Sequence, residues 1–481
     1  MSSLSISATL EYGKIAVGKN KTEQHLLVTL EGKKLPAGSR KPLALSAIID
    51  CSGSMSGDKI ETAKKTLIKL IDNLTSEDSL GAAGFSDTVF QIFPTQKMTH
   101  ENKEKCKQHV EGLVSLASTN LAGGMLEGFS MLKNVDTSYD IVRVFLMTDG
   151  LPNVGISTPD GLVNLVKGRP ERVTLSTFGY GSDHDPELLT SMAKNGKGNF
   201  YFIKTIDECP SVFGRELGGL LTCSAQNIKV KIKAKPDVKI LDVISDFDVD
   251  GKDDKSEAVI SVDDVYSEER RQVLLKVELP AFEKVPPRPL KIADIEVDFY
   301  DVQAKEPRQE TTKVEVNYVK VEDADTVPAA AVKDELLRVQ AAKAQEEAMK
   351  LARSGNFIGA QNYVMAAISN CQQAGTAMGA AMADDLVNTV MPMYQSHASY
   401  SASENYLRAN VGSYTSARGQ TAGGARLFST PSAQATAAKF GGPSVANGIQ
   451  AVSGGAGVKP PMITNTPKKP EGLSKSRSKR R

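Results

Sequence analysis

The chain has 481 residues, and its 58 lysines and arginines nearly balance its 57 aspartates and glutamates, which gives a formal net charge of +1 at pH 7. This balance argues against a nucleic-acid or membrane partner recruited by global charge. The five cysteines are scattered, odd in number and without Cys-x-x-Cys spacing. We therefore expect neither a disulfide framework nor a zinc site.

The N-terminal residues lack the basic and apolar regions of a signal peptide, and no apolar stretch is long enough to span a bilayer. We expect an intracellular protein of two or three domains that is not transmembrane. Its expected location is the cytoplasm, with the nucleus as the alternative.

Residues 1–42 are predicted to form strands. Apolar and polar residues alternate around residues 6–12 and 26–30, which is the pattern of half-buried strands. These strands find no partner in the pattern that follows directly. We therefore expect them to complete a β-sandwich formed by residues further along the chain.

From residue 43 the pattern is typical of an α/β domain. The apolar run 43–49 predicts a buried parallel strand, and an amphipathic helix begins a few residues later. The turn between them carries Asp50, Ser52 and Ser54, whose oxygens could converge on a hard cation such as Mg²⁺. The same residue types also cap helices, so this cluster alone leaves a metal site and a simple N-cap open.

Two later segments favour the metal site. Thr119 lies in a polar loop that opens a helix, and a second buried strand, 141–147, ends in Thr148-Asp149-Gly150. The carboxyl ends of parallel strands share one edge of a sheet, where ligands bind. The three segments together resemble the metal-ion-dependent adhesion site of von Willebrand factor A domains, and the resemblance covers about residues 43–222. It implies a Rossmann-like parallel sheet for this domain.

The resemblance also implies a site and a function. Ser52, Ser54 and Thr119 match the hydroxyl ligands of that family, and Asp50 and Asp149 match its acidic pair. The implied ion is Mg²⁺, with Mn²⁺ or Ca²⁺ as alternatives. The implied partner is a protein that presents an acidic residue to the ion, and no small-molecule substrate is expected.

Residues 225–322 are predicted to form the main part of the β-sandwich, because short alternating strands are separated by Pro, Gly and Asp turns. Within them, Asp246, Asp248, Asp250 and Glu257 satisfy the oxygen-ligand positions of an EF-hand loop, which makes them a second candidate site, for calcium. Their flanks are strand-like rather than helical, so an acidic hairpin turn is the alternative.

Residues 329–395 return to helical spacing and predict a helical hairpin, which is either a small core or a groove for a partner helix. Residues 400–481 are rich in Ser, Ala, Gly, Thr and Pro and are expected to be mostly disordered. The chain ends in a basic run. This run could be a nuclear-import signal, a weak contact to nucleic acid or another anionic surface, or a solvated tail.

This order of regions resembles an intracellular subset of proteins with these domains, which includes plant RING-type ubiquitin ligases. The scattered cysteines cannot supply the two zinc sites of a RING, so ligase activity is not implied, and an adaptor role remains as an alternative. Catalysis is not expected, because Ser54 has neither a nucleophile elbow nor a neighbouring histidine. A third alternative is a structural protein whose metal only stabilises loops.

Overall fold

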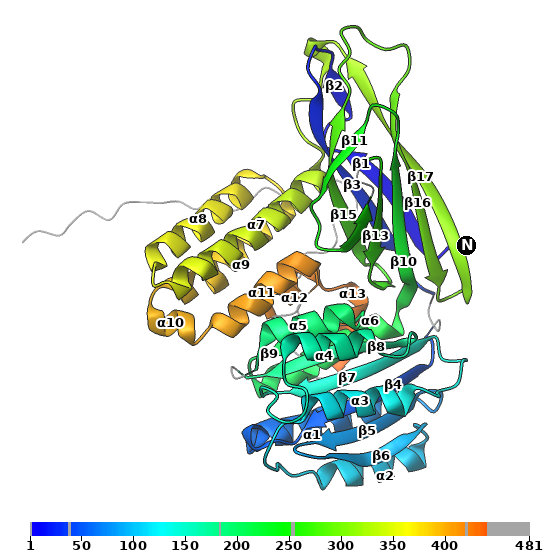
Figure 1. The fold of residues 1–481 in the computed structure, drawn as a ribbon, viewed down its shortest axis with the longest axis vertical. Helices are drawn as coiled ribbons and strands as arrows, with labels where there is room; N and C mark the ends of the chain where they lie inside the picture. The colour runs from blue at the N-terminus through cyan, green and yellow to red at the C-terminus, as the bar shows by residue number, and fades with distance from the viewer. Residues whose placement is uncertain (1, 37–39, 182–183, 252–254, 419–421, 440–481) are drawn as a thin grey trace, which may run out of the picture.

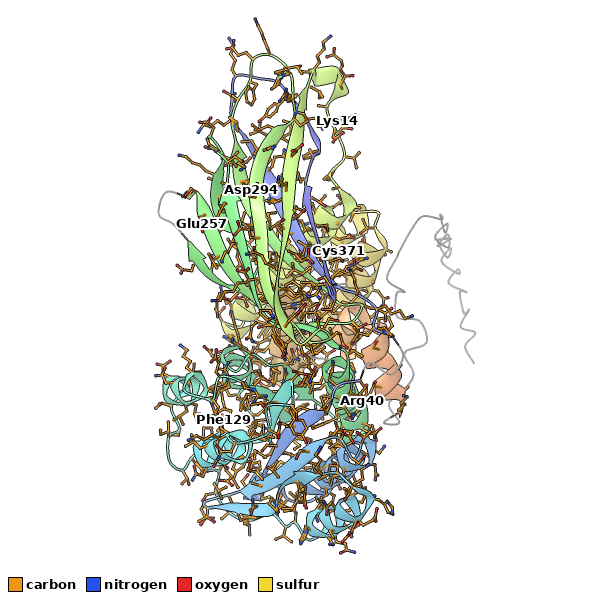
Figure 2. All side chains as sticks on the ribbon, turned by 90° about the vertical axis from the view of Figure 1, so that its right-hand side faces the viewer. Lys14, Arg40, Phe129, Glu257, Asp294 and Cys371 are labelled. Carbon is orange, nitrogen blue, oxygen red and sulfur yellow. The ribbon has the colours of Figure 1, made fainter. Side chains whose placement is uncertain are left out.

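A computed structural model describes residues 2–36, 40–181, 184–251, 255–418 and 422–439 of the chain (Figure 1). A β-sandwich lies at one end, an α/β domain at the other, and helices lie beside and between them. Figure 2 shows the same division from the side, with Glu257 and Asp294 on the sandwich and Phe129 in the α/β domain. Within the part of the chain that the structure describes, no helix is long and apolar enough to cross a membrane.

The α/β domain is built on a six-stranded sheet. Its strands are β4 (Leu43–Asp50), β5 (Ser79–Phe85), β6 (Val89–Lys97), β7 (Ile141–Thr148), β8 (Val173–Tyr180) and β9 (Phe200–Ile203). Their order is β6-β5-β4-β7-β8-β9, and every neighbouring pair is parallel except β5 with β6. Every residue of β4 and β7 is buried, which explains why both strands are mostly apolar in the sequence, with Arg143 as the charged exception in β7.

Helices cover both faces of this sheet, and each face has its own core. One face packs against α1 (Asp58–Asn73), α2 (His100–Glu111) and α6 (Cys209–Leu221). The other face packs against α3 (Leu121–Leu132), α4 (Pro159–Lys167) and α5 (Pro186–Asn195). The predicted α/β fold class with a parallel sheet is therefore confirmed.

The β-sandwich consists of two antiparallel sheets, except that β2 pairs with β17 in parallel. One sheet has the order β1-β3-β15-β11, and the other has the order β12-β13-β10-β16-β17-β2, with β14 paired to β10. The strands are β1 (Leu4–Leu10), β2 (Lys14–Ala16), β3 (Thr22–Gly32), β10 (Cys223–Ala234), β11 (Lys239–Val243), β12 (Asp248–Gly251), β13 (Glu257–Val262), β14 (Val265–Tyr266), β15 (Arg270–Leu279), β16 (Leu290–Asp301) and β17 (Glu306–Val319).

The N-terminal strands belong to this sandwich. Strand β3 pairs with β15 along its length, for example Val28 opposite Val273, and apolar residues of both sheets share one core. In the sequence, the α/β domain therefore lies between two parts of the sandwich. This arrangement needs two chain crossings at the junction, one before β4 and one after α6.

The helical region begins with a hairpin of α7 (Ala330–Arg353) and α8 (Phe357–Gln373), followed by α9 (Ala377–Asp385). A π-helical turn (Leu386–Val390) and a 3₁₀ turn (Met391–Tyr394) lead to α10 (His397–Ser401). The chain then enters α11 (Glu404–Ser416), α12 (Ala422–Phe428) and α13 (Pro431–Lys439). These three helices lie between the sandwich and the α/β domain (Figure 1).

The expectation that residues 400–481 are mostly disordered needs correction for the residues of α11 to α13, which are helical. The small residues that suggested disorder allow close helix packing instead. A β-carbon on Gly218 of α6 would lie 2.9 Å from Cα of Ala433, and one on Gly214 would clash with the backbone of Ala437. Residues 440–481, with the basic run, lie outside the described residues.

We expect Gly214→Ala to destabilise the protein by about 1–3 kcal/mol, because the added methyl group meets backbone that cannot move aside by rotamer change. Alanine in an unobstructed helix would have the opposite effect. Urea unfolding of the full chain measures the change. Gly112→Ala is the matched control, since its added β-carbon would come no closer than 3.5 Å to a neighbour. Equal stability of Gly214→Ala and wild type would contradict the α6–α13 packing.

Candidate metal centre

The loop after β4 carries the first predicted ligands at the carboxyl edge of the sheet. Asp50 is the last residue of β4, and its Oδ1 accepts a 2.8 Å hydrogen bond from the backbone N–H of Ser52. A 3₁₀ turn (Gly53–Met55) then leads towards α1. The loop is tied to the α2–α3 loop, because Leu116 N–H donates to the Cys51 carbonyl at 2.5 Å and Gly53 N–H donates to the Ala117 carbonyl at 3.1 Å.

The hydroxyl and carboxylate groups of this loop reach Asp149, which follows β7. Ser52 Oγ and Ser54 Oγ are 3.0 Å apart, and Ser54 Oγ donates to Asp149 Oδ1 at 2.8 Å. Asp50 and Asp149 are fully buried, whereas Ser54 is exposed. The two carboxylates therefore form the floor of the site and Ser54 its opening.

Thr119 reaches the same place from the loop that opens α3. It is buried, and its backbone N–H donates to Asn153 Oδ1 at 2.8 Å, which fixes the loop against the segment after β7. A β-carbon on Gly150 would lie 3.3 Å from Ser54 Oγ, 3.6 Å from Thr119 Oγ1 and 3.9 Å from Asp50 Oδ2. Oxygens from three separate segments thus surround one small volume that a side chain at position 150 would fill.

The donor set fits a small hard cation. It consists of two carboxylates and three hydroxyls, without nitrogen or sulfur ligands, and Mg²⁺, Mn²⁺ and Ca²⁺ favour such oxygens. Glycine at position 150 leaves the volume open. The described residues contain no group of three or more His, Cys, Asp and Glu side chains placed for a metal, so hydroxyls are essential to any metal site here.

Two residues of this site were not predicted from the sequence. Thr148 Oγ1 donates to Asp50 Oδ2 at 2.5 Å and accepts from Gly150 N–H at 3.2 Å. The ammonium of Lys59, in the first turn of α1, forms an ion pair with Asp149 Oδ2. In the sequence, only the position of Thr148 next to Asp149 indicated that this threonine belongs to the site. For Lys59, the only indication was its closeness to the loop after β4.

Burial raises the pKa of the Asp50 carboxyl above its ordinary value. The hydrogen bonds from Thr148 and Ser52 offset part of this effect, and the nearby Asp149 carboxylate adds to it. Ionisation of Asp50 in the folded protein therefore costs free energy when no cation is bound. A divalent ion in the volume beside Gly150 would remove that cost.

The second candidate site, which the sequence predicted for calcium, lies in the sandwich around β12 and β13. Asp246 Oδ1 accepts a 2.9 Å hydrogen bond from Lys194 of α5. Asp248 and Asp250 are exposed on β12, which pairs with residues 258–261 of β13, directly after Glu257. Residues 252–254, between these strands, lie outside the described residues. Asp248, Asp250 and Glu257 thus lie on paired β-strands, and Asp246 lies just before the first of them.

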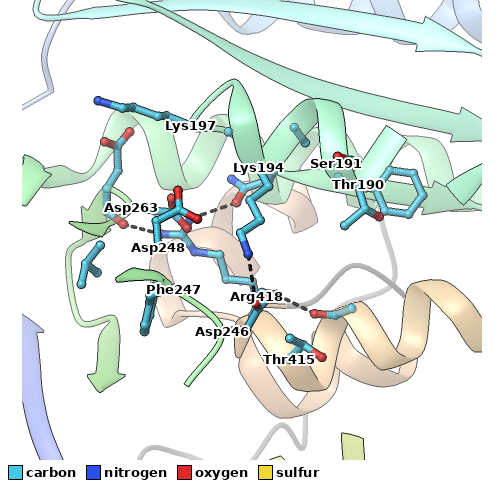
Figure 3. Close-up of a pocket in the computed structure, with 18 of the residues that line it drawn as sticks. Thr190, Ser191, Lys194, Lys197, Asp246, Phe247, Asp248, Asp263, Thr415 and Arg418 are labelled. Carbon is cyan, nitrogen blue, oxygen red and sulfur yellow. Dashed lines mark hydrogen bonds and ion pairs between the residues drawn. The ribbon is translucent and has the colours of Figure 1, made fainter. Parts of the chain in front are cut away.

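A cavity of about 700 Å³ lies where the α/β domain, the sandwich and α11 meet (Figure 3). Figure 3 shows Lys194 reaching Asp246 across it, and Arg408 of α11 forms a 3.0 Å ion pair with Glu187 of α5. On its wall, Arg418 donates to Asn199 Oδ1 at 2.9 Å. Charged groups from the three parts thus neutralise one another at this junction.

The junction cavity is separate from the candidate metal centre. Asn199, which lines it, directly precedes β9, and Glu171, which also lines it, precedes β8. Asp50 and Asp149 instead follow β4 and β7. Since these strands are parallel, the cavity and the metal centre lie at opposite edges of the sheet.

Comparisons with known proteins agree with this fold. Residues 45–215 match the von Willebrand factor type A (VWA) domain. The uncharacterised protein YfbK of Escherichia coli is 29% identical over 209 residues, which are 43% of this chain and 35% of YfbK. The human inter-alpha-trypsin inhibitor heavy chain H3 is 30% identical over 164 residues, which are 33% of this chain and 18% of that protein. The chain thus spans about a third of these relatives or less.

Two solved structures show a similar fold over most of the chain. A von Willebrand factor type A protein from Catenulispora acidiphila has a TM-score of 0.63 at 15% identity, covering 79% of this chain and 88% of its own. The ArnB paralog VWA2 from Sulfolobus acidocaldarius has a TM-score of 0.53 at 15% identity, covering 84% and 98%. The resemblance to plant RING ubiquitin ligases is not supported. Residues 45–215 are thus similar to a VWA domain, and the chain continues into additional C-terminal regions.

Proposed function

We propose that this protein binds a partner protein through a divalent ion, Mg²⁺ or alternatively Mn²⁺ or Ca²⁺, held by Asp50, Ser52, Ser54, Thr119 and Asp149. VWA domains are generally adhesion or protein-interaction modules, and some carry metal-ion-dependent adhesion sites. The convergence of oxygens from three segments around Gly150 carries the proposal. When bound, the ion would offer a coordination position to a carboxylate of the partner.

The surroundings of the site favour a protein partner over a small anion. Val114 and Leu116 are exposed in the loop before Thr119, and Leu151 and Ile156 are exposed in the loop after Asp149. Exposed apolar side chains around a polar centre are typical of protein interfaces. We infer that the partner segment carries an acidic residue flanked by apolar side chains.

The described contacts support binding rather than catalysis. His184 is the histidine of the α/β domain that lies between β8 and α5. It is buried, its ring packs near Phe200 and Phe202, and its Nδ1 lies 3.4 Å from the Tyr180 carbonyl. VWA domains are mostly non-enzymatic binding domains. The alternative in which the ion only stabilises loops predicts metal-dependent folding without metal-dependent partner binding.

We further propose a cytoplasmic location, with nuclear import as the alternative. All five cysteines are buried and unpaired, which suits a reducing compartment. The second candidate site is not needed for this function. Calcium binding by Asp246, Asp248, Asp250 and Glu257 remains a separate proposal, tested by Ca²⁺ titration of Asp248→Asn.

We expect Asp50→Asn to be more stable than wild type at pH 7 without metal, and to lose the stabilisation by Mg²⁺. In the folded protein the pKa of Asp50 is raised above 3.8, so wild type loses stability as the pH rises from 3.8 through the raised pKa. The side chain introduced by Asp50→Asn does not titrate, so the variant has no such loss. At a Mg²⁺ concentration about 100 times the Kd, wild type should gain about 2.7 kcal/mol. Urea unfolding with Mg²⁺ or EDTA from pH 4 to 8 measures both effects.

The exposed Asp242→Asn is the control for that experiment, and it should behave as wild type. A wild type that gains no stability from Mg²⁺, Mn²⁺ or Ca²⁺ would contradict the metal centre. An equal gain in wild type and Asp50→Asn would place the metal elsewhere.

Replacing Leu151 and Ile156 together with Gln should reduce partner retention about tenfold or more without changing Mg²⁺ affinity, because apolar side chains that a partner buries contribute to the binding energy. The measurement is a pull-down from native lysate with Mg²⁺ or EDTA, followed by quantitative mass spectrometry. Val321 and Val327, replaced together with Gln, are the matched control, since both are exposed on the segment bound to β2. Proteins retained equally in EDTA would exclude metal-dependent binding.

A further inference from the structure

Lys59 places a cation of the chain itself on one of the proposed metal ligands. It is the second residue of α1, and its ammonium forms an ion pair with Asp149 Oδ2. The other oxygen of Asp149 accepts the hydrogen bond from Ser54. The Lys59 side chain is 30% exposed, whereas that of Asp149 is fully buried.

The charges of the site explain this contact. Asp50 and Asp149 are both fully buried, and buried carboxylates are stable only when hydrogen bonds or cations compensate their charge. Thr148 and Ser52 supply hydrogen bonds to Asp50, and Lys59 supplies a positive charge to Asp149. A divalent ion beside these carboxylates would repel an ammonium held at the same group.

The structure also offers a place for the displaced side chain. Lys59 lines a groove of about 330 Å³ between α1 and the carboxyl ends of β8 and β9, together with Thr62, Gly181 and Asp207. The lysine stem passes close to Gly181, whose added β-carbon would lie 3.5 Å from Lys59 Cε. The exposed Asp207 carboxylate provides a negative charge within this groove, and the ammonium of Lys204, which also lines it, lies over the ring of Tyr406.

We propose that Lys59 is a tethered cation that stabilises the metal-free centre and is displaced towards this groove when a divalent ion binds. The inference rests on the proposed function, because it concerns the same metal centre. Lys59 then lowers the affinity for metal, since every binding event must break its ion pair with Asp149. It also keeps the metal-free protein folded, so the centre can gain and lose its ion without unfolding.

Lys59→Met tests this proposal in the full chain, with Lys65→Met as the matched control. Lys65 lies on the same helix, is exposed and carries the same charge. Isothermal titration with MgCl₂ should show about tenfold or more tighter binding by Lys59→Met and no change for Lys65→Met. In EDTA, Lys59→Met should melt below wild type, and saturating Mg²⁺ should remove most of that difference.

The outcomes separate this inference from the proposed function. If wild type binds Mg²⁺ and Lys59→Met binds it with the same affinity, only the role of Lys59 is overturned. If neither protein binds Mg²⁺, Mn²⁺ or Ca²⁺, the proposed metal centre itself is wrong. If Lys59→Met does not fold in EDTA, Lys59→Gln replaces it, since the amide keeps a donor for Asp149 without the charge. Lys59→Arg keeps the charge and should retain the affinity of wild type.

Discussion

The architecture depends on one buried guanidinium. Arg143 of β7 is 1% exposed, and it forms 3.0 Å ion pairs with Glu216 of α6 and with Asp264 of the sandwich. Burial alone would lower the pKa of Arg143, but Tyr266, Glu216 and Asp264 raise it above its ordinary value. Replacing Arg143 with an uncharged residue would leave the buried Glu216 and Asp264 carboxylates without this cation, which is strongly destabilising. The central sheet, its last helix and the sandwich are therefore held in one arrangement.

The same cluster continues into the C-terminal region. Arg418 donates to Glu269 Oε1 at 2.7 Å, and its guanidinium lies 4.6 Å from the ring centroid of Tyr266. Arg143 is near the beginning of β7, whereas Asp149 follows its end, about 20 Å away at the rise of a strand. The sandwich and the C-terminal helices are thus anchored at one edge of the sheet. The candidate metal centre is left at the other.

The sequence predicted those features that depend on short stretches of chain. Residues 43–49 and 141–147 were recognisable because strands buried on both faces are mostly apolar. The proposed ligands Asp50 and Asp149 lie directly after these neighbouring strands. Their position at one sheet edge therefore followed from the strand pattern, although their ligation of a metal remains a prediction.

Features that depend on distant partners were not predictable in this way. Arg143 interrupts an apolar run, and its acidic partners lie 73 and 121 residues further along the chain. Helix α13 lacks large apolar residues because its alanines pack against the glycines of α6. The contact of Lys59 with Asp149 spans 90 residues, and nothing in the sequence near either residue indicates it.

Buried carboxylates at the two edges of the sheet are neutralised by different kinds of residue. This difference supports the proposal that the compensating charge is exchanged at the carboxyl edge. At the junction, Glu216, Asp264 and Glu269 are held by arginines, whose rigid, permanently charged guanidinium groups bind several acceptors at once. At the carboxyl edge, Asp149 is held by the single ammonium of a flexible lysine that borders open space. A cation from solution can displace a lysine of this kind far more readily than an enclosed arginine network. Under the proposal for Lys59, the chain therefore combines a junction neutralised by arginines with a position at the carboxyl edge where the compensating charge is exchanged.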